Sequence, residues 1–216
     1  MKRKLLRIAG VLLTVLVVLA AVLVIRAWML ESIQPEVEEA ENLPEVRGGA
    51  VERLSGAVQI ETTSPDEFSD EQLGEFEEFQ AYLVDNFPLV HRHLQRERVE
   101  PCSLLYTWKA KGSDARPALL MSHQDVVPVE EDQEDKWTHP PFSGAVADGY
   151  IWGRGTLDIK TGVLGILEAT ETLLEAGWEP RRTFMFAFGC DEEIGGRKGA
   201  KKIAALLEKR DVQLAW

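Results

Sequence analysis

Two short polar stretches each lie where an apolar strand is expected to end, and a third lies between them in the sequence. They are SHQD at residues 122–125, CDEE at residues 190–193 and, between these, GRGTLD at residues 153–158. Histidine and carboxylate side chains are ligands of catalytic zinc, and a carboxylate that does not bind the ion can act as a general base. Together the three stretches predict a hydrolase site built around two metal ions.

His123 and Asp125 are two residues apart, just after the apolar run 118–121. An extended backbone points such residues to the same side, so the imidazole can bind a metal while the carboxylate orients it. Taken alone, the His-x-Asp pattern is common by chance, and a histidine buried in the core is the more frequent explanation. Its place after a strand favours the metal interpretation, because ligands gather at the carboxyl ends of strands in open parallel sheets.

Asp158, Glu192 and Glu193 are the other candidates for the site. Asp158 opens a predicted helix, where the roles of N-cap and metal ligand have equal support. Glu192 and Glu193 follow an aromatic strand, and neighbouring side chains diverge, so one carboxylate can hold a metal while the other faces a substrate water. Taken alone, they would be interpreted as solvated acids at the start of a helix. Three such signals at successive strand ends favour a shared site.

Alternating strands and helices are expected to position these stretches. Apolar runs predict strands at residues 103–108, 118–121 and 183–188, and helical periodicity predicts helices at residues 160–176 and 200–207. An amphipathic helix precedes them from Asp70 to Phe87, where Pro88 ends or kinks it. Strands separated by helices indicate an α/β domain with a largely parallel sheet and helices on both faces. Residues 212–216 are predicted to begin the next strand.

Residues 1–30 are predicted to form a transmembrane helix. Residues 8–25 are uncharged and mostly apolar, and a helix of this length spans roughly 27 Å, close to the thickness of a hydrocarbon core. Four basic residues precede this run and only Arg26 follows it, which predicts a cytoplasmic N-terminus and an extracytoplasmic domain. No small-x-small cleavage pattern follows, so an uncleaved signal anchor is favoured over secretion after signal cleavage and over a buried soluble helix.

Residues 31–70 are rich in Glu, Pro, Gly and Ser without a sustained period, so they are predicted to be an acidic tether to the domain that begins at residue 71. The formal net charge of the chain is −12. No basic cluster exists outside the N-terminus, which argues against a nucleic-acid partner, since such binding needs a basic surface.

Two histidines and two cysteines have roles that the sequence leaves open. His91 and His93 have no carboxylate cluster around them, so we expect surface histidines rather than metal ligands. Cys102 and Cys190 could form a disulfide in an oxidising compartment if their Cα atoms come within roughly 7 Å. Cys190 could also bind a metal, although a buried free cysteine is the commoner state.

Four ordered motifs carry a resemblance to a known enzyme family. They are SHQDVVP at residues 122–128, Trp137 with PPFSG at residues 140–144, GYIWGRGTLD at residues 149–158 and DEEIGG at residues 191–196. From about Glu75 to Trp216 the chain resembles the dinuclear zinc aminoacylase/carboxypeptidase family, most closely its carboxypeptidase S-like branch, which includes secreted N-acyl-amino-acid hydrolases. The resemblance implies the three-layer α/β/α fold of zinc exopeptidases, with a mostly parallel sheet.

The resemblance also implies a role for each candidate. His123 binds one zinc ion with support from Asp125, Asp158 bridges two zinc ions, Glu193 binds the other ion and Glu192 is the general base. Cobalt or manganese would fit the same ligands. Paired zinc ions lower the pKa of a water, and Glu192 takes the proton as that water attacks an amide carbonyl. The implied substrates are peptides cleaved at their C-terminal residue and N-acyl amino acids.

Some features depart from the family pattern. Family members have a further acidic ligand, a later histidine and a smaller domain that often mediates homodimerisation, and we expect these beyond Trp216. Residues 71–216 would then be the N-terminal part of a catalytic domain. Ile159 stands where many relatives carry a second aspartate, and Cys190 where close relatives tend to carry histidine. The alternative to an enzyme is a truncated, non-catalytic metal-binding or interaction remnant.

Overall fold

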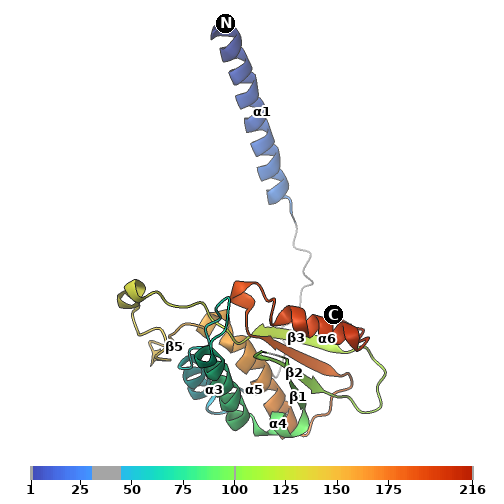
Figure 1. Cartoon of the computed structure of the whole chain (residues 1–216). Helices are drawn as coiled ribbons and strands as arrows, with labels where there is room; N and C mark the ends of the chain where they lie inside the picture. Colours follow the sequence, from blue (N-terminus) through green and yellow to red (C-terminus); the bar gives the residue numbers. More distant parts are fainter. Residues whose placement is uncertain (1, 31–44, 100, 216) are drawn as a thin grey trace. The chain divides into compact units, whose positions relative to one another are not determined.

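The computed structural model describes residues 2–30, 45–99 and 101–215 of the chain. The chain divides into two compact units, residues 1–44 and residues 45–216. The first unit contains helix α1 (Lys2–Trp28), which is long and apolar enough to cross a membrane (Figure 1). Its apolar side chains are exposed rather than buried within the protein. The predicted apolar helix at the N-terminus is therefore present.

The second unit is built on a four-stranded sheet with the order β1-β2-β6-β3. The strands are β1 (Gln95–Val99), β2 (Ser103–Trp108), β3 (Ala118–His123) and β6 (Phe184–Gly189). The β3–β6 pair is parallel, whereas the β1–β2 and β2–β6 pairs are antiparallel. The α/β class is confirmed, and this part of the sheet is mixed. The sequence does not predict β1, because that strand is polar and mostly exposed.

Helices cover both faces of the sheet and give the three predicted layers (Figure 1). One face is covered by α2 (Ala50–Val58), α3 (Asp70–Asn86), α4 (Pro88–His93) and α5 (Thr161–Glu175). The other face is covered by α6 (Ala200–Lys209), whose Ile203 and Leu207 pack against Leu105 and Met185. Because side chains alternate along each strand, β2 and β6 contribute to both cores.

Recognisable sequence signals mark the start of α3, the start of α4 and the end of α5. A capping box joins Ser69 and Gln72 at the start of α3: each side chain binds the other residue's backbone amide. Pro88 is the first residue of α4, so of the two predicted possibilities, an end or a kink, the structure shows that the preceding helix ends. Gly177, with a φ of 70°, follows α5 and adopts the left-handed conformation that glycine tolerates best.

A long connection leads from the end of β3 to the start of α5. It contains the short helix η1 (Glu131–Lys136) and the two-stranded hairpin of β4 (Val146–Ala147) and β5 (Tyr150–Ile151). It ends in the stretch at residues 153–158 that carries Asp158. A one-turn helix, η3 (Glu192–Ile194), follows β6. The three predicted functional stretches therefore lie at the end of β3 (residues 122–125), before α5 (residues 153–158) and after β6 (residues 190–193).

Residues 45–70 differ from the predicted tether because they belong to the folded unit. Helix α2 lies within this range and buries Leu54, Ala57 and Val58. Arg53 Nη2 lies 3.0 Å from Glu168 Oε2 on α5, which ties the helix to the domain. The apolar spacing in α2 is only two turns long and is interrupted by Gly56, so it gives a weak periodic signal. Residues 31–44 of the predicted tether lie outside the described residues.

Residues 212–215 do not form the strand that the sequence predicts. The Ala215 amide donates to the Pro117 carbonyl at 2.8 Å, beside the start of β3, and the Val212 amide donates to the Leu207 carbonyl at 3.0 Å. A strand requires a ladder of bonds to a neighbour. Val212 and Leu214 instead pack, partly buried, against the core under α6.

Cys102 and Cys190 form a disulfide, with their Cα atoms 5.8 Å apart. The alternatives of a free thiol and a metal-bound thiol are therefore wrong for this structure. The antiparallel register that places Leu104 opposite Phe188 brings the two cysteines together just beyond the paired residues. The cross-link joins residues 88 positions apart, and a closed loop of that size is worth about 4 kcal/mol of stability in the chain-entropy description.

Candidate metal centre

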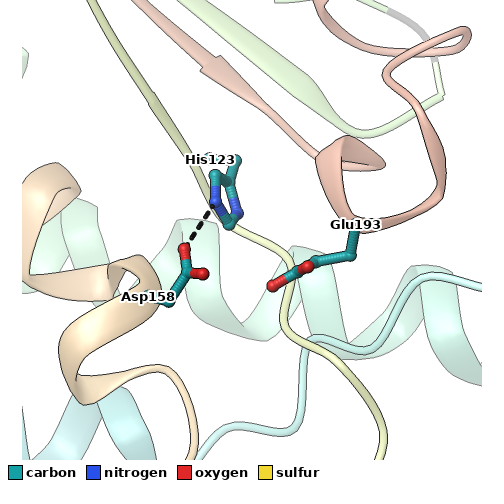
Figure 2. A group of neighbouring side chains, drawn as sticks. All are labelled: His123, Asp158 and Glu193. Atoms are coloured by element: carbon teal, nitrogen blue, oxygen red, sulfur yellow. Dashed lines mark hydrogen bonds and ion pairs between the residues drawn. The ribbon is translucent and has the colours of Figure 1, made fainter. Parts of the chain in front are cut away.

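His123 is the last residue of β3, and its buried ring faces the other predicted site residues. Its Nδ1 lies 2.9 Å from the Asp125 backbone carbonyl, so this nitrogen carries a proton and donates it. Its Nε2 lies 3.2 Å from Asp158 Oδ1 (Figure 2). The same nitrogen lies 3.7 Å from Glu192 Oε2. A fixed Nδ1–H leaves Nε2 as the atom that can bind a metal when that nitrogen is deprotonated.

Asp158 comes from the turn that precedes α5, and its side chain is 75% exposed. It does not cap α5, which begins without a side-chain cap. The N-cap interpretation is therefore wrong, and the carboxylate faces His123 instead. Gly155, with a φ of 84°, forms the tight turn before Asp158, and its carbonyl accepts a bond from the Lys160 amide at 2.8 Å.

Glu192 and Glu193 lie on η3, directly after β6. One oxygen of Glu193, one oxygen of Asp158 and one nitrogen of His123 all lie within 4.8 Å of one another (Figure 2). Partial burial, followed by the charge of Asp158, raises the pKa of Glu193. Glu192 lies beside the same histidine without belonging to that group of three. The structure thus brings His123, Asp158, Glu192 and Glu193 to one edge of the sheet.

Asp125 is completely buried behind His123. Its Oδ2 accepts hydrogen bonds from Ser64 Oγ at 2.8 Å and from the Glu193 amide at 3.0 Å. Burial acts to raise its pKa, but the hydrogen bonds from His123, the Glu193 amide and Ser64 outweigh burial and lower it. Asp125 is thus an ionised carboxylate that joins the strand of His123 to the helix of Glu193.

The pKa of His123 follows from the same contacts. Burial acts to lower it, but hydrogen bonds to Asp125 and the charges of Asp125 and Glu192 raise it to about 9. The imidazole therefore carries a positive charge at neutral pH in the metal-free protein. This positive charge occupies the place among the carboxylates that a metal cation would take.

The donor set fits a zinc site. One imidazole nitrogen and carboxylate oxygens from two residues are the donor types that catalytic zinc binds. The Asp125 backbone carbonyl accepts the Nδ1–H bond of His123, the kind of bond that commonly fixes a zinc-bound imidazole, and its carboxylate Oδ1 lies 3.5 Å from the same nitrogen. Within the described residues, His123, Asp158 and Glu193 are the grouped side chains of this kind.

Two supporting residues cannot be found by sequence reasoning. Ser64 lies in the predicted tether, and nothing in the sequence signals its bond to Asp125. Lys160 is fully buried, donates to the carbonyl oxygens of Ala57, at 2.9 Å, and Ile60, and has its pKa lowered to about 7 by burial. A lysine at the start of a helix normally indicates a solvated position, so only the structure reveals that Lys160 ties Ala57 to the Asp158 turn.

His91 and His93, whose roles the sequence left open, lie outside this centre. His93 is exposed, as predicted. His91 is half-buried, which differs from the predicted surface position, because its ring packs on Tyr106 and its Nε2 lies 2.9 Å from the Tyr106 hydroxyl. Burial lowers the pKa of His91. Neither residue belongs to the grouped metal-ligand candidates among the described residues.

Comparisons with known proteins agree with the motifs. Residues 119–215 match Peptidase family M20/M25/M40. The chain is 44% identical over 164 residues to "Probable carboxypeptidase S-like 2" of Dictyostelium discoideum, a match that covers 74% of this chain and 31% of the relative. It is 45% identical over 176 residues to "N-fatty-acyl-amino acid synthase/hydrolase PM20D1" of Mus musculus, a match that covers 80% of this chain and 34% of the relative. The chain thus spans about a third of the length of these relatives.

A solved structure shares the fold. The chain superimposes on an M20 family metallo-carboxypeptidase, Sso-CP2 from Sulfolobus solfataricus, with a TM-score of 0.59 at 18% sequence identity. That match covers 78% of this chain and 36% of the other. The relatives and this shared fold confirm the resemblance drawn from the four motifs.

Proposed function

Because residues 119–215 belong to peptidase family M20/M25/M40, we propose that this chain carries the metal-binding part of a zinc-dependent amide hydrolase. The proposed substrates are peptides cleaved at their C-terminal residue and N-acyl amino acids. One observation carries the proposal: His123, Asp158 and Glu193 place donor atoms within 4.8 Å of one another. Glu192, which lies outside that group, is 3.7 Å from the same histidine.

In this proposal His123, Asp158 and Glu193 would hold two zinc ions. His123 would bind one ion through Nε2, Glu193 would bind the other and Asp158 would serve both. Cobalt or manganese suits the same donors. Bound zinc supplies Lewis acidity, which lowers the pKa of water and polarises the amide carbonyl.

Glu192 is proposed to move the proton. Its carboxylate accepts a proton from the attacking water and returns it to the nitrogen of the departing amine. The side chain comes from η3, which the Glu193 amide fixes to Asp125 at 3.0 Å. Glu192 is 59% exposed, so its carboxylate is accessible to a substrate. Asp125 holds His123 in one orientation and does not contact the substrate.

The substrate class is supported by the relatives. The name of one describes a carboxypeptidase S-like protein, and that of another a synthase/hydrolase of N-fatty-acyl amino acids. Both activities act on an amide bond next to an amino acid. The chemistry proposed for Glu192 is the same for either substrate, because in both cases water attacks an amide carbonyl and an amino acid leaves.

We propose that α1 anchors the protein in a membrane, with residues 45–216 on the extracytoplasmic side. The anchor rests on the length and apolarity of α1. The disulfide between Cys102 and Cys190 supports the location, because such bonds persist in oxidising compartments. Secretion after signal cleavage is the alternative, and it would place the domain in the same kind of compartment.

Hydrolysis by the full chain in detergent tests the proposed function. Incubation with N-acyl amino acids and short peptides is expected to release free amino acids, measured by mass spectrometry. Release should stop when a chelator removes the metal and resume when zinc is added back. A chain that binds zinc but hydrolyses none of these substrates would contradict the enzyme and favour the non-catalytic metal-binding alternative.

A further inference from the structure

The disulfide between Cys102 and Cys190 lies directly behind the metal centre. Cys190 follows the last residue of β6 and precedes Asp191, Glu192 and Glu193 in the sequence. Cys102 precedes the first residue of β2. The bond therefore fixes the end of β6 to the neighbouring strand at the point where the chain turns into η3, which supplies two of the proposed site residues.

Both cysteines are completely buried and pack against Phe76 of α3. The Cys102 carbonyl also accepts hydrogen bonds from Gln80 Nε2 at 2.6 Å and from Gln124 Nε2 at 3.0 Å. Gln124 lies between His123 and Asp125, and its side-chain Nε2 also donates to the Phe188 carbonyl at 2.9 Å. One buried glutamine thus links the disulfide to the strand end that carries His123.

Glu193 is held from two directions. On one side the covalent bond at Cys190 fixes the chain three residues before it. On the other side its amide donates to Asp125 Oδ2 at 3.0 Å. The Glu193 side chain is only partly buried, so its place near His123 depends on the backbone of η3. A change in the path of the chain after Cys190 would move this carboxylate relative to the other two ligands.

We propose that the Cys102–Cys190 disulfide is a positioning element of the metal centre, which sets the place of Glu193 relative to His123 and Asp158. The bond touches neither substrate nor metal and acts through η3. This inference rests on the proposed metal site. Loss of a group that orients a metal ligand weakens metal affinity by roughly 10- to 100-fold, and we expect a loss in that range without the disulfide.

The test replaces both cysteines with alanine, because a single replacement would leave a free thiol that can itself bind zinc. Zinc affinity of the full chain in detergent is measured by competition with a chromophoric chelator, at a temperature where circular dichroism shows the fold intact. The control is Val90→Ala, a buried change in α4, which supplies no residue to the metal centre. The double variant should bind zinc at least about 10-fold more weakly than the wild type, whereas the control should bind as the wild type does.

Three outcomes would overturn the proposal. Equal zinc affinity in the wild type and the double variant would make the bond purely a stabiliser of the fold. Two free thiols in the native chain, found by alkylation and mass spectrometry, would remove the bond itself. A wild-type chain that binds no zinc would overturn both the proposed metal site and this inference. The first two outcomes, in contrast, would overturn this inference alone.

A second measurement applies if the double variant does not fold. Hydrogen exchange of the wild-type chain is then followed with and without a dithiol reductant, which converts the disulfide to two thiols and is itself oxidised to a disulfide. Faster exchange confined to the amides of residues 191–196 after reduction supports the proposal. Unchanged exchange in that segment, with reduction verified by mass spectrometry, would overturn it.

Discussion

Glu192→Gln is expected to lower kcat for amide hydrolysis by roughly 10²- to 10⁴-fold while leaving zinc bound. Glutamine keeps the size of the side chain but cannot accept the proton of the attacking water or return it to the departing amine. Zinc should stay, because Glu192 lies outside the group formed by His123, Asp158 and Glu193. The measurement is steady-state hydrolysis together with zinc content by mass spectrometry.

Two further variants make this result specific. Glu78→Gln changes an exposed glutamate on α3, away from the site, and should leave both kcat and zinc content unchanged. Glu193→Gln removes a proposed ligand and should lower zinc content as well as kcat. If Glu192→Gln retained wild-type kcat, or lost zinc as Glu193→Gln does, the assignment of Glu192 as general base would be wrong.

Zinc affinity is expected to rise by about 50-fold between pH 7 and pH 9, at roughly tenfold for each pH unit well below the pKa. The contacts of His123 raise its pKa from 6.5 to about 9 in the metal-free chain, so the ring is protonated through most of this range. Zinc binds only the neutral ring and must displace that proton. Affinity should therefore increase as the pH approaches 9 and level off above it. The measurement is a competition titration at several pH values, corrected for proton binding by the competing chelator.

His93→Ala is the control for this pH dependence, because His93 is exposed and lies outside the site. It should retain the wild-type dependence of zinc affinity on pH. A zinc affinity of the wild type that does not change from pH 7 to pH 9 would contradict the role of His123.

The stability of the metal-free chain is a less specific measure, because two groups have opposite effects on it. The raised pKa of His123 gives stability that is present below pH 6.5 and lost as the pH rises to about 9. The lowered pKa of Lys160 imposes a cost that is present below about pH 7 and disappears by about pH 10.5.

The strands and helices that position the site residues can be predicted from the sequence, because the signals for these elements are local. Runs of apolar residues define β2, β3 and β6, and helical periodicity defines α3, α5 and α6. The carboxyl ends of the parallel strands β3 and β6 then place His123 and Glu193 at the same edge of the sheet. Each candidate residue, taken alone, can be explained without a metal site. The order of the candidates along successive elements is what makes the site predictable.

The remaining features depend on contacts between distant segments, which local patterns do not contain. Helix α2 buries a short apolar face in a stretch whose composition indicates a tether. Antiparallel pairing of β2 with β6 brings Cys102 to Cys190, although neither residue signals its partner. Lys160 is buried because backbone carbonyls from α2 and the residues after it accept its hydrogen bonds. In each case the contacting residue lies far away in the sequence. Composition and periodicity therefore predict the wrong burial or contacts for these residues, or predict none.

The most direct test of the proposed metal centre is the zinc K-edge X-ray absorption spectrum of the zinc-loaded chain, recorded alongside His123→Ala. We expect nitrogen and oxygen ligands with the scattering of an imidazole ring, and no sulfur, because both cysteines are in the disulfide. The imidazole signal should disappear in His123→Ala. A sulfur ligand, or an imidazole signal that persists in the variant, would show that zinc binds elsewhere and would contradict the metal centre of His123, Asp158 and Glu193.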